Sequence, residues 1–195
     1  MSRIATVKRE TGETSIEIKL NLDGTGRADI NTGIGFFDHM LNNFARHGLF
    51  DLSVHAKGDL YVDCHHLIED VGIVLGQAVK EAVGDKKSIK RYGSAILPMD
   101  EALILCALDL CGRPYFVYDL NFSTPSCGYF ETAMCKEFFY AVSYSAAMNL
   151  HLKMLSGEND HHIIECAFKS FAKALDMAVQ VDNRIDSVLS TKGVL

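Results

Sequence analysis

One five-residue pattern, His-His-x-x-Glu, occurs once in each half of this 195-residue chain and could bind metal ions. The copies are His65-His66-Leu67-Ile68-Glu69 and His161-His162-Ile163-Ile164-Glu165. In a helix, the first histidine and the glutamate share one face because they lie four residues apart, while the second histidine points about 100° away. Each copy therefore offers two ligands to one metal ion and a histidine to a second. Accidental histidine pairs at a solvated helix end would not explain the repeat.

The elements that must position these residues repeat as well. Each half reads as strand, strand, helix, strand and helix, and the first half has room for an extra strand after Gly26. In the first half we expect strands at 3–9, 14–22 and 51–56 and helices at 36–50 and 63–83. In the second half we expect strands at 102–109, 115–121 and 149–155 and helices at 131–148 and 161–179. The sequence thus predicts an α+β fold of internally duplicated β-β-α-β-α halves, with sheets packed against a helical layer. We expect a single domain over 1–195, built from repeats of roughly 1–92 and 93–195.

The duplication also relates residues outside the two motifs. His39 lies 26 residues before His65, and Glu137 lies 24 residues before His161, so Glu137 is the counterpart of His39. A pseudo-twofold axis between the halves would exchange the related residues and create two mixed ligand sets. One set is His39, His66, His161 and Glu165, and the other is Glu137, His65, His162 and Glu69. The sequence leaves open whether each set forms within one chain or across a subunit boundary.

The ligand types indicate which metal such a site would hold. Mixed imidazole and carboxylate ligands with open positions suit Mn²⁺ or Fe²⁺, and Zn²⁺ is possible. A structural zinc site would be closed and usually rich in thiolates. The six cysteines form no C-x-x-C pair, and we interpret them as free thiols with packing roles. The sequence therefore favours an open two-metal site over a structural zinc site.

Several further polar residues could take part in a site. Arg91, Arg113 and Lys192 could clamp a phosphate together with hydroxyls and backbone amides, although each alone is more often a solvated surface charge. Asp100 and Glu101 precede an apolar strand, where one of them could support the site or both could belong to the strand edge.

Three histidines lie outside the two ligand sets. His47 shares a predicted helix face with His39 and could line a pocket as an acid, a base or a substrate contact. His55 and His151 match each other across the repeat, and we interpret them as structural.

Composition and charge exclude several classes of protein. With 48% hydrophobic and 23% charged residues, the chain has the composition of an ordinary globular protein. A net charge of −6 without a basic stripe argues against nucleic-acid binding. No apolar run is long enough to cross a bilayer, and the N-terminus lacks a signal-peptide h-region. We therefore expect a cytoplasmic protein with neither a nucleic-acid nor a membrane partner.

Longer stretches make the whole chain resemble imidazoleglycerol-phosphate dehydratase, a lyase family of histidine biosynthesis. The resemblance is carried, in chain order, by Asn21-Leu22-Asp23-Gly24-Thr25-Gly26, Gly35-Phe36-Phe37-Asp38-His39-Met40-Leu41, Asp63-Cys64-His65-His66-Leu67-Ile68-Glu69-Asp70, Gly112-Arg113-Pro114-Tyr115, His161-His162-Ile163-Ile164-Glu165 and Ser190-Thr191-Lys192-Gly193-Val194-Leu195.

The resemblance implies a duplicated α+β fold, a cage-like homo-oligomer that is typically a 24-mer, and two Mn²⁺ per active site at subunit interfaces. The family's metal ligands fall on His39, His65, His66, Glu69, His161, His162 and Glu165. Many relatives have histidine where this chain has Glu137, and we expect Glu137 to be a ligand because a carboxylate also binds Mn²⁺.

The resemblance also implies a reaction and a small phosphorylated imidazole substrate. Imidazole glycerol phosphate would lose water to give imidazole acetol phosphate. Substrate contacts carry over to Glu13, His47, Arg91, Arg113, Ser190, Thr191 and Lys192, with the arginines and the C-terminal residues on the phosphate. Glu13, Glu165 and His47 are the candidates for moving protons.

Two other functions fit the ligand residues alone. A di-metal hydrolase would use a bridging hydroxide to attack a phosphoester or an amide. A non-enzymatic metal-binding or cage-forming protein would have no open coordination position and no dependence on Arg91 or Arg113.

Overall fold

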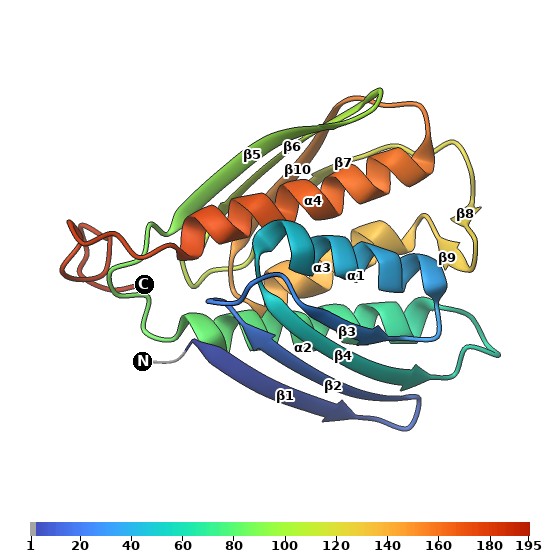
Figure 1. The fold of residues 1–195 in the computed structure, drawn as a ribbon, viewed down its shortest axis with the longest axis horizontal. Helices are drawn as coiled ribbons and strands as arrows, with labels where there is room; N and C mark the ends of the chain where they lie inside the picture. The colour runs from blue at the N-terminus through green and yellow to red at the C-terminus, as the bar shows by residue number, and fades with distance from the viewer. Residues whose placement is uncertain (1–2) are drawn as a thin grey trace.

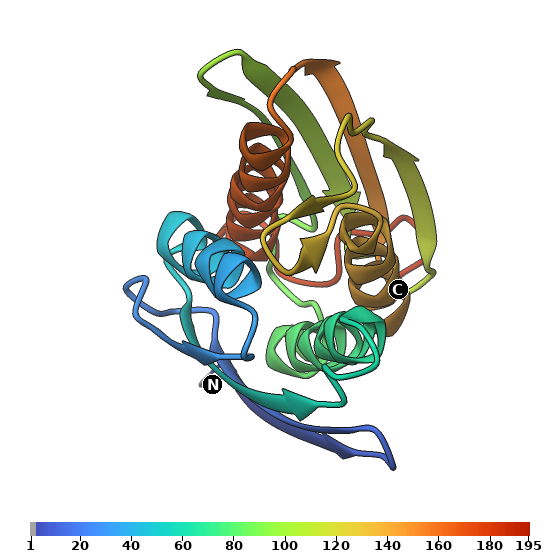
Figure 2. The same ribbon diagram turned by 90° about the vertical axis from the view of Figure 1, so that its right-hand side faces the viewer.

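Two four-stranded sheets form the outer layers of the molecule, and four helices lie between them (Figures 1 and 2). The computed structural model describes residues 3–195. Met1 and Ser2, the first residues of the N-terminal stretch that lacks a signal-peptide h-region, lie outside the described residues. Among the described helices, none combines the length and apolar character that crossing a membrane requires.

The first sheet and its two helices come from the first half of the chain. The strands are β1 (Ile4–Glu10), β2 (Thr14–Asn21), β3 (Ala28–Asn31) and β4 (Asp51–Gly58), in the spatial order β1-β2-β4-β3. Strand β3 runs parallel to β4, and the other neighbours are antiparallel. Helices α1 (Gly35–Gly48) and α2 (His65–Val83) cover one face of the sheet. The alternation predicted for β2 holds, because Ile16, Ile18 and Leu20 are buried toward these helices.

The second half repeats this arrangement. Strands β5 (Tyr92–Met99), β6 (Ala102–Asp109), β7 (Tyr115–Asp119) and β10 (Asn149–Ser156) form a sheet in the order β5-β6-β10-β7. Again one edge strand, β7, runs parallel to its neighbour. Helices α3 (Met134–Ser145) and α4 (Asp160–Val179) pack on it, and a small hairpin of β8 (Ser126–Cys127) and β9 (Phe130–Glu131) precedes α3. The identical strand order in both halves confirms the predicted α+β duplication.

Each four-stranded sheet contains one strand more than the basic predicted unit supplies, and the β8–β9 hairpin of the second half was not expected either. Strand β3 is the extra strand for which the sequence had room, whereas β5 was not expected. Its sequence contains Gly93 and Pro98 and alternates poorly, so the usual strand signal is weak. The structure explains Gly93, because a Cβ there would lie 1.8 Å from the carbonyl oxygen of Ala174 in α4. Because Gly93 has no side chain, β5 can approach the backbone of α4 closely.

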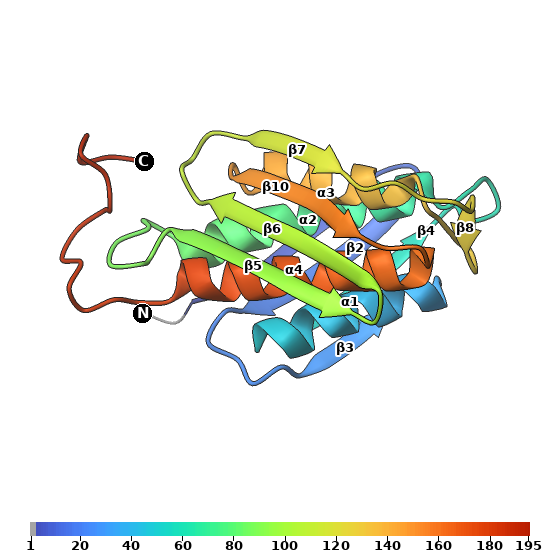
Figure 3. The ribbon, with the colours of Figure 1, turned by 90° about the horizontal axis from the view of Figure 1, so that it is seen from above.

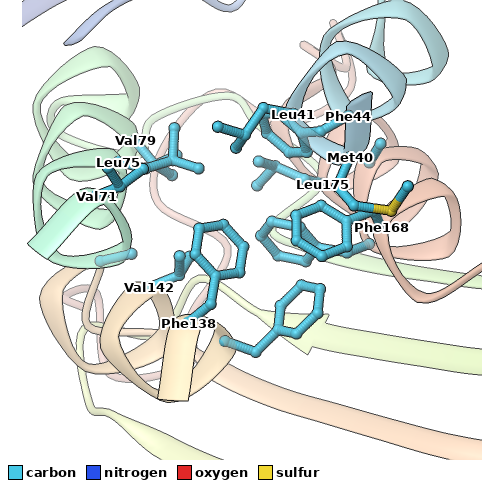
Figure 4. Close-up of a cluster of buried hydrophobic side chains, with 14 of the residues drawn as sticks. Met40, Leu41, Phe44, Val71, Leu75, Val79, Phe138, Val142, Phe168 and Leu175 are labelled. Atoms are coloured by element: carbon cyan, nitrogen blue, oxygen red, sulfur yellow. The ribbon is translucent and has the colours of Figure 1, made fainter. Parts of the chain in front are cut away.

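The core lies where the four helices meet (Figure 4). The rings of Phe138 and Phe168 stack with centroids 5.0 Å apart, joining α3 to α4, and those of Phe44 and Phe171 stack at 5.5 Å, joining α1 to α4. This packing fixes the helix starts from which the repeated motif projects.

Candidate active site

The two copies of the motif begin helices α2 and α4, at the same end of the molecule (Figure 1). The side chain of Asn159 accepts hydrogen bonds from the backbone N–H groups of His161, at 3.0 Å, and His162, at 3.4 Å. In the first half, Asp63 accepts the N–H of His65 at 2.8 Å. Such side chains satisfy backbone donors that a helix start leaves unpaired. Each motif is therefore anchored by an Asn or Asp two residues before its first histidine.

Three of the predicted ligands converge between α1 and α4. The Nε2 atoms of His39 and His161 lie 3.1 Å and 3.2 Å from the same oxygen, Oε2 of Glu165. One potential ligand atom from each residue lies within 4.8 Å of the others. Two imidazole nitrogens and a carboxylate at this spacing match the donors that Mn²⁺, Fe²⁺ or Zn²⁺ accept.

Glu165 is held ionised although its side chain is only 7% exposed. Burial raises the pKa of this carboxyl, but the hydrogen bond and charge of Lys169, together with those of His39, outweigh burial and lower the pKa below its ordinary value. The Nζ of Lys169 lies 2.5 Å from Oε1, so the other oxygen faces the two histidines. Lys169 was missed by sequence reasoning, although its position four residues after Glu165 on one helix could have revealed it.

The counterpart cluster lies between α2 and α3 and is more open. His65 Nε2 lies 3.7 Å from Glu69 Oε2, and both side chains are exposed. Desolvation, the hydrogen bond and charge of Tyr144, and the negative charges of Glu137 and Glu69 raise the pKa of Tyr140. Among residues 3–195, however, no three-residue ligand group forms around His65.

The second histidine of each motif points to carboxylates elsewhere. His66 Nδ1 lies 3.0 Å from Asp59 and 3.6 Å from Glu13, and these three residues form a separate potential ligand group. His162 Nδ1 lies 2.8 Å from Glu101. The structure therefore brings together three members of the predicted set of His39, His66, His161 and Glu165, and it places His66 in another cluster.

The partners of these histidines shift their pKa values. The hydrogen bond with Asp59 raises the pKa of His66, and the hydrogen bond with Glu101 raises that of His162. The same bond with His162, followed by bonds from the Asn159 and Glu158 N–H groups, lowers the pKa of Glu101 to about 2. Asp59 was missed because a loop brings it to His66, and loop geometry leaves no periodic signal in the sequence.

His47 lies farther along α1, toward α4, and remains exposed. Burial lowers its pKa, as does the charge of Lys169, while the charge of Glu165 opposes them. A largely neutral imidazole near the Glu165 cluster could accept a proton.

The predicted phosphate residues line a cavity of about 720 Å³ at the other end of the molecule, where the chain continues beyond α4 (Figure 3). Arg113, Ser190, Thr191 and Lys192 line it. Arg91 also lines it but is 9% exposed, and its guanidinium donates to Asp109 at 2.6 and 2.9 Å and to the Leu189 carbonyl at 2.7 Å. Arg91 therefore fixes the segment that carries Ser190 to Lys192. Asp109 was not found from the sequence.

The ends that carry the motifs and the cavity are far apart. Helix α4 begins with the motif and leads to the C-terminal segment, and its 20 residues span ~30 Å. A small phosphorylated molecule could not reach both ends of one chain.

Comparison with known proteins decides the family. The family model described as imidazoleglycerol-phosphate dehydratase matches residues 32–175. This chain belongs to that family. The imidazoleglycerol-phosphate dehydratase of Lachnoclostridium phytofermentans is 60% identical over 195 residues, covering 100% of both chains, and that of Geobacter sulfurreducens is 54% identical with the same coverage. The chain is thus a hydro-lyase, and the family name implies histidine biosynthesis and imidazole glycerol phosphate as the substrate.

Solved structures of the family share the fold. The Staphylococcus aureus imidazoleglycerol-phosphate dehydratase is 38% identical, with a TM-score of 0.83 over 92% of this chain and 99% of that one. The Pyrococcus furiosus structure, also of this dehydratase, is 39% identical, with a TM-score of 0.84 over 97% and 100%. The likeness extends over both halves of the chain, so the duplication is a property shared with these structures.

Proposed function

We propose that this hydro-lyase converts imidazole glycerol phosphate into imidazole acetol phosphate and that the reaction requires two bound Mn²⁺ ions per active site. The observation that carries the metal requirement is the convergence of His39, His161 and ionised Glu165. Fe²⁺ or Zn²⁺ would fit the same donors. One ion would be held by His39, His161 and Glu165 together with a His66 from another copy of the chain, because the chain's own His66 lies in a separate cluster. The other ion would be held by Glu137, His65, His162 and Glu69.

When bound, the two ions would supply Lewis acidity and a fixed template for the imidazole of the substrate. The chain's own residues have to perform the remaining tasks. Arg113, Ser190, Thr191 and Lys192 would hold the phosphate, because their side chains line one cavity. Arg91 would keep that segment in place through Asp109 and the Leu189 carbonyl, rather than grip the phosphate alone.

Dehydration also requires a group that takes a proton from carbon and one that gives a proton to the departing hydroxyl. Of the three candidates, Glu13 fits the proton transfer best. Its side chain is 57% exposed at the motif end, where it is free to reach a substrate. Glu165 is occupied by His39, His161 and Lys169, and therefore fits better as a ligand. His47 could exchange protons with the site from α1.

The active site would be shared between copies of the chain. The phosphate cavity and the motifs lie at opposite ends of α4, ~30 Å apart by the length of a 20-residue helix. A second copy must therefore bring its cavity to the motifs of the first. This requirement supports a homo-oligomer, and the family resemblance implies that it is typically a 24-mer.

Metal removal tests this proposal. Purified oligomer should contain Mn²⁺ or a related divalent ion, and chelation should abolish dehydration, with Mn²⁺ restoring it. The assay should follow imidazole acetol phosphate and inorganic phosphate separately, because release of phosphate would indicate a hydrolase. Full activity in metal-free protein would refute the metal requirement.

A further inference from the structure

Both second histidines of the repeated motif have a carboxylate on the same ring nitrogen. His66 Nδ1 lies 3.0 Å from Asp59, and His162 Nδ1 lies 2.8 Å from Glu101. The Nε2 atom of each ring therefore points away from its carboxylate. Asp100 lies 3.6 Å from His162 Nε2, beyond hydrogen-bond distance, and its side chain is 73% exposed.

The duplication does not explain this agreement. Glu13 directly precedes β2 and Glu101 directly precedes β6, so Glu13 is the counterpart of Glu101. His55 in β4 corresponds to His151 in β10, which makes Leu155 the counterpart of Asp59 four residues later. The same contact thus arises from different loops in the two halves.

Both carboxylates are held more firmly than a surface charge. The Asp59 side chain is 12% exposed, and its two oxygens lie 3.0 and 3.3 Å from His66 Nδ1. Glu101 Oε1 accepts the N–H groups of Asn159 at 2.8 Å and Glu158 at 3.2 Å. These bonds direct Oε2 of Glu101 to His162.

We propose that Asp59 and Glu101 are positioning residues that keep the proton of His66 and His162 on Nδ1 and leave each Nε2 free to bind a metal ion. A carboxylate on one imidazole nitrogen fixes the tautomer and orientation of a ligating histidine. The inference rests on the proposed function, because it assigns both histidines to metal ions.

This assignment also explains why the counterparts Glu13 and Glu101 differ. Asp59 occupies the contact with His66, while Glu13 lies 3.6 Å from the same nitrogen and stays exposed. Both carboxylate oxygens of Glu101 already have partners, one in His162 and the other in the N–H of Asn159 before α4. One half of the duplication thus has a free carboxylate at the position where the other half has a structural one.

The test is a titration of metal-free oligomer with Mn²⁺ alone. Asp59→Ala should lower the affinity for one of the two Mn²⁺ ions by about 10- to 100-fold, and Glu101→Gln should lower the affinity for the other by a similar factor. In the glutamine variant, the N–H groups of Asn159 and Glu158 retain the amide oxygen, so the amide NH₂ faces His162 Nδ1 and forces the proton onto Nε2. The matched control is Asp29→Ala, which removes a carboxylate 3.0 Å from His55 on the outer face of the first sheet and should leave both affinities unchanged.

Asp59→Asn separates tautomer control from charge. Its amide can turn its oxygen toward His66 Nδ1, so Mn²⁺ binding should recover most of the affinity lost in Asp59→Ala. Equal weakening in both variants would overturn the tautomer role, as would wild-type affinity in Asp59→Ala and Glu101→Gln. Absence of Mn²⁺ binding in the wild-type protein would instead overturn the proposed function. Thermal unfolding of each metal-free variant distinguishes lost binding from lost structure.

Discussion

At the scale of single residues, the site depends on keeping one buried carboxylate charged. Glu165 receives Lys169 on one oxygen and two histidines on the other. The spacing of the motif was enough to predict that His161 and Glu165 share a helix face, and the duplication was enough to bring in His39. Asp59, by contrast, approaches His66 through a loop fold that no periodicity encodes.

Lys169→Met should move the loss of metal and activity to higher pH. The ordinary expectation for a buried carboxyl is a raised pKa, and Lys169 is the main group that lowers the pKa of Glu165. The depressed pKa keeps Glu165 charged down to low pH, and its charge is lost only as the pH falls through that value. Without Lys169, protonation begins at higher pH. The pH profile of kcat/KM and of bound Mn²⁺ measures the shift.

Lys173→Met is the control for this pH effect, because Lys173 pairs with Asp176 on the same helix at 3.0 Å. The acid limb of its Mn²⁺ binding should match that of the wild-type protein. Bound Mn²⁺ is the readout for this control, because the charge of Lys173 also lowers the pKa of His47 and could alter kcat/KM. An unchanged acid limb in Lys169→Met would show that Lys169 does not keep Glu165 ionised.

At the scale of elements, close helix contacts hold the motifs in place. Amphipathic periodicity predicted α2 and α4 to within two residues, because their apolar stripes are long. Helix α3 begins at Met134 rather than near 131, because Phe130 and Glu131 pair in β9. Strand β5 was not predicted because glycine is a weak strand signal in a sequence. In the structure, however, only a glycine at position 93 lets β5 pack closely against α4.

Gly76→Ala should destabilise the protein by about 1–3 kcal/mol, the usual cost of overpacking. A Cβ at this position of α2 would lie 2.6 Å from the Val142 carbonyl oxygen and 2.7 Å from the Ser145 Cβ of α3. Separating these helices would also displace His65, at the start of α2, relative to α3. Chemical denaturation at fixed protein concentration measures the free energy of unfolding.

Gly35→Ala provides a helix control, because a Cβ at the start of α1 would meet nothing within 4 Å. It should unfold at or slightly above the wild-type denaturant concentration. If Gly76→Ala is as stable as Gly35→Ala, the contact between α2 and α3 does not limit the approach of these helices.

At the scale of the whole molecule, activity depends on how the motifs at one end and the phosphate cavity at the other end are brought together. The sequence motifs identified the metal-binding residues and the phosphate-binding residues, but not the ~30 Å that α4 places between them. That distance depends on the direction in which α4 runs in the packed structure. A site confined to one chain and a site shared between copies make opposite predictions for mixtures of inactive subunits. His161→Ala disables the motif end, and Arg113→Ala disables the cavity end.

Co-expression of these two variants should restore activity that neither has alone. In a mixed oligomer, some sites combine the intact motif of an Arg113→Ala chain with the intact cavity of a His161→Ala chain. Random assembly at equal amounts makes up to about one quarter of the sites intact if each site joins two chains. The measurement is dehydratase activity of oligomers purified through two different tags, one on each variant.

Co-expression of Arg113→Ala with Lys192→Ala should restore nothing when both residues contact one phosphate, since every cavity stays defective. Absence of recovery in the first mixture, with mixed oligomers verified, would place the complete site within one chain.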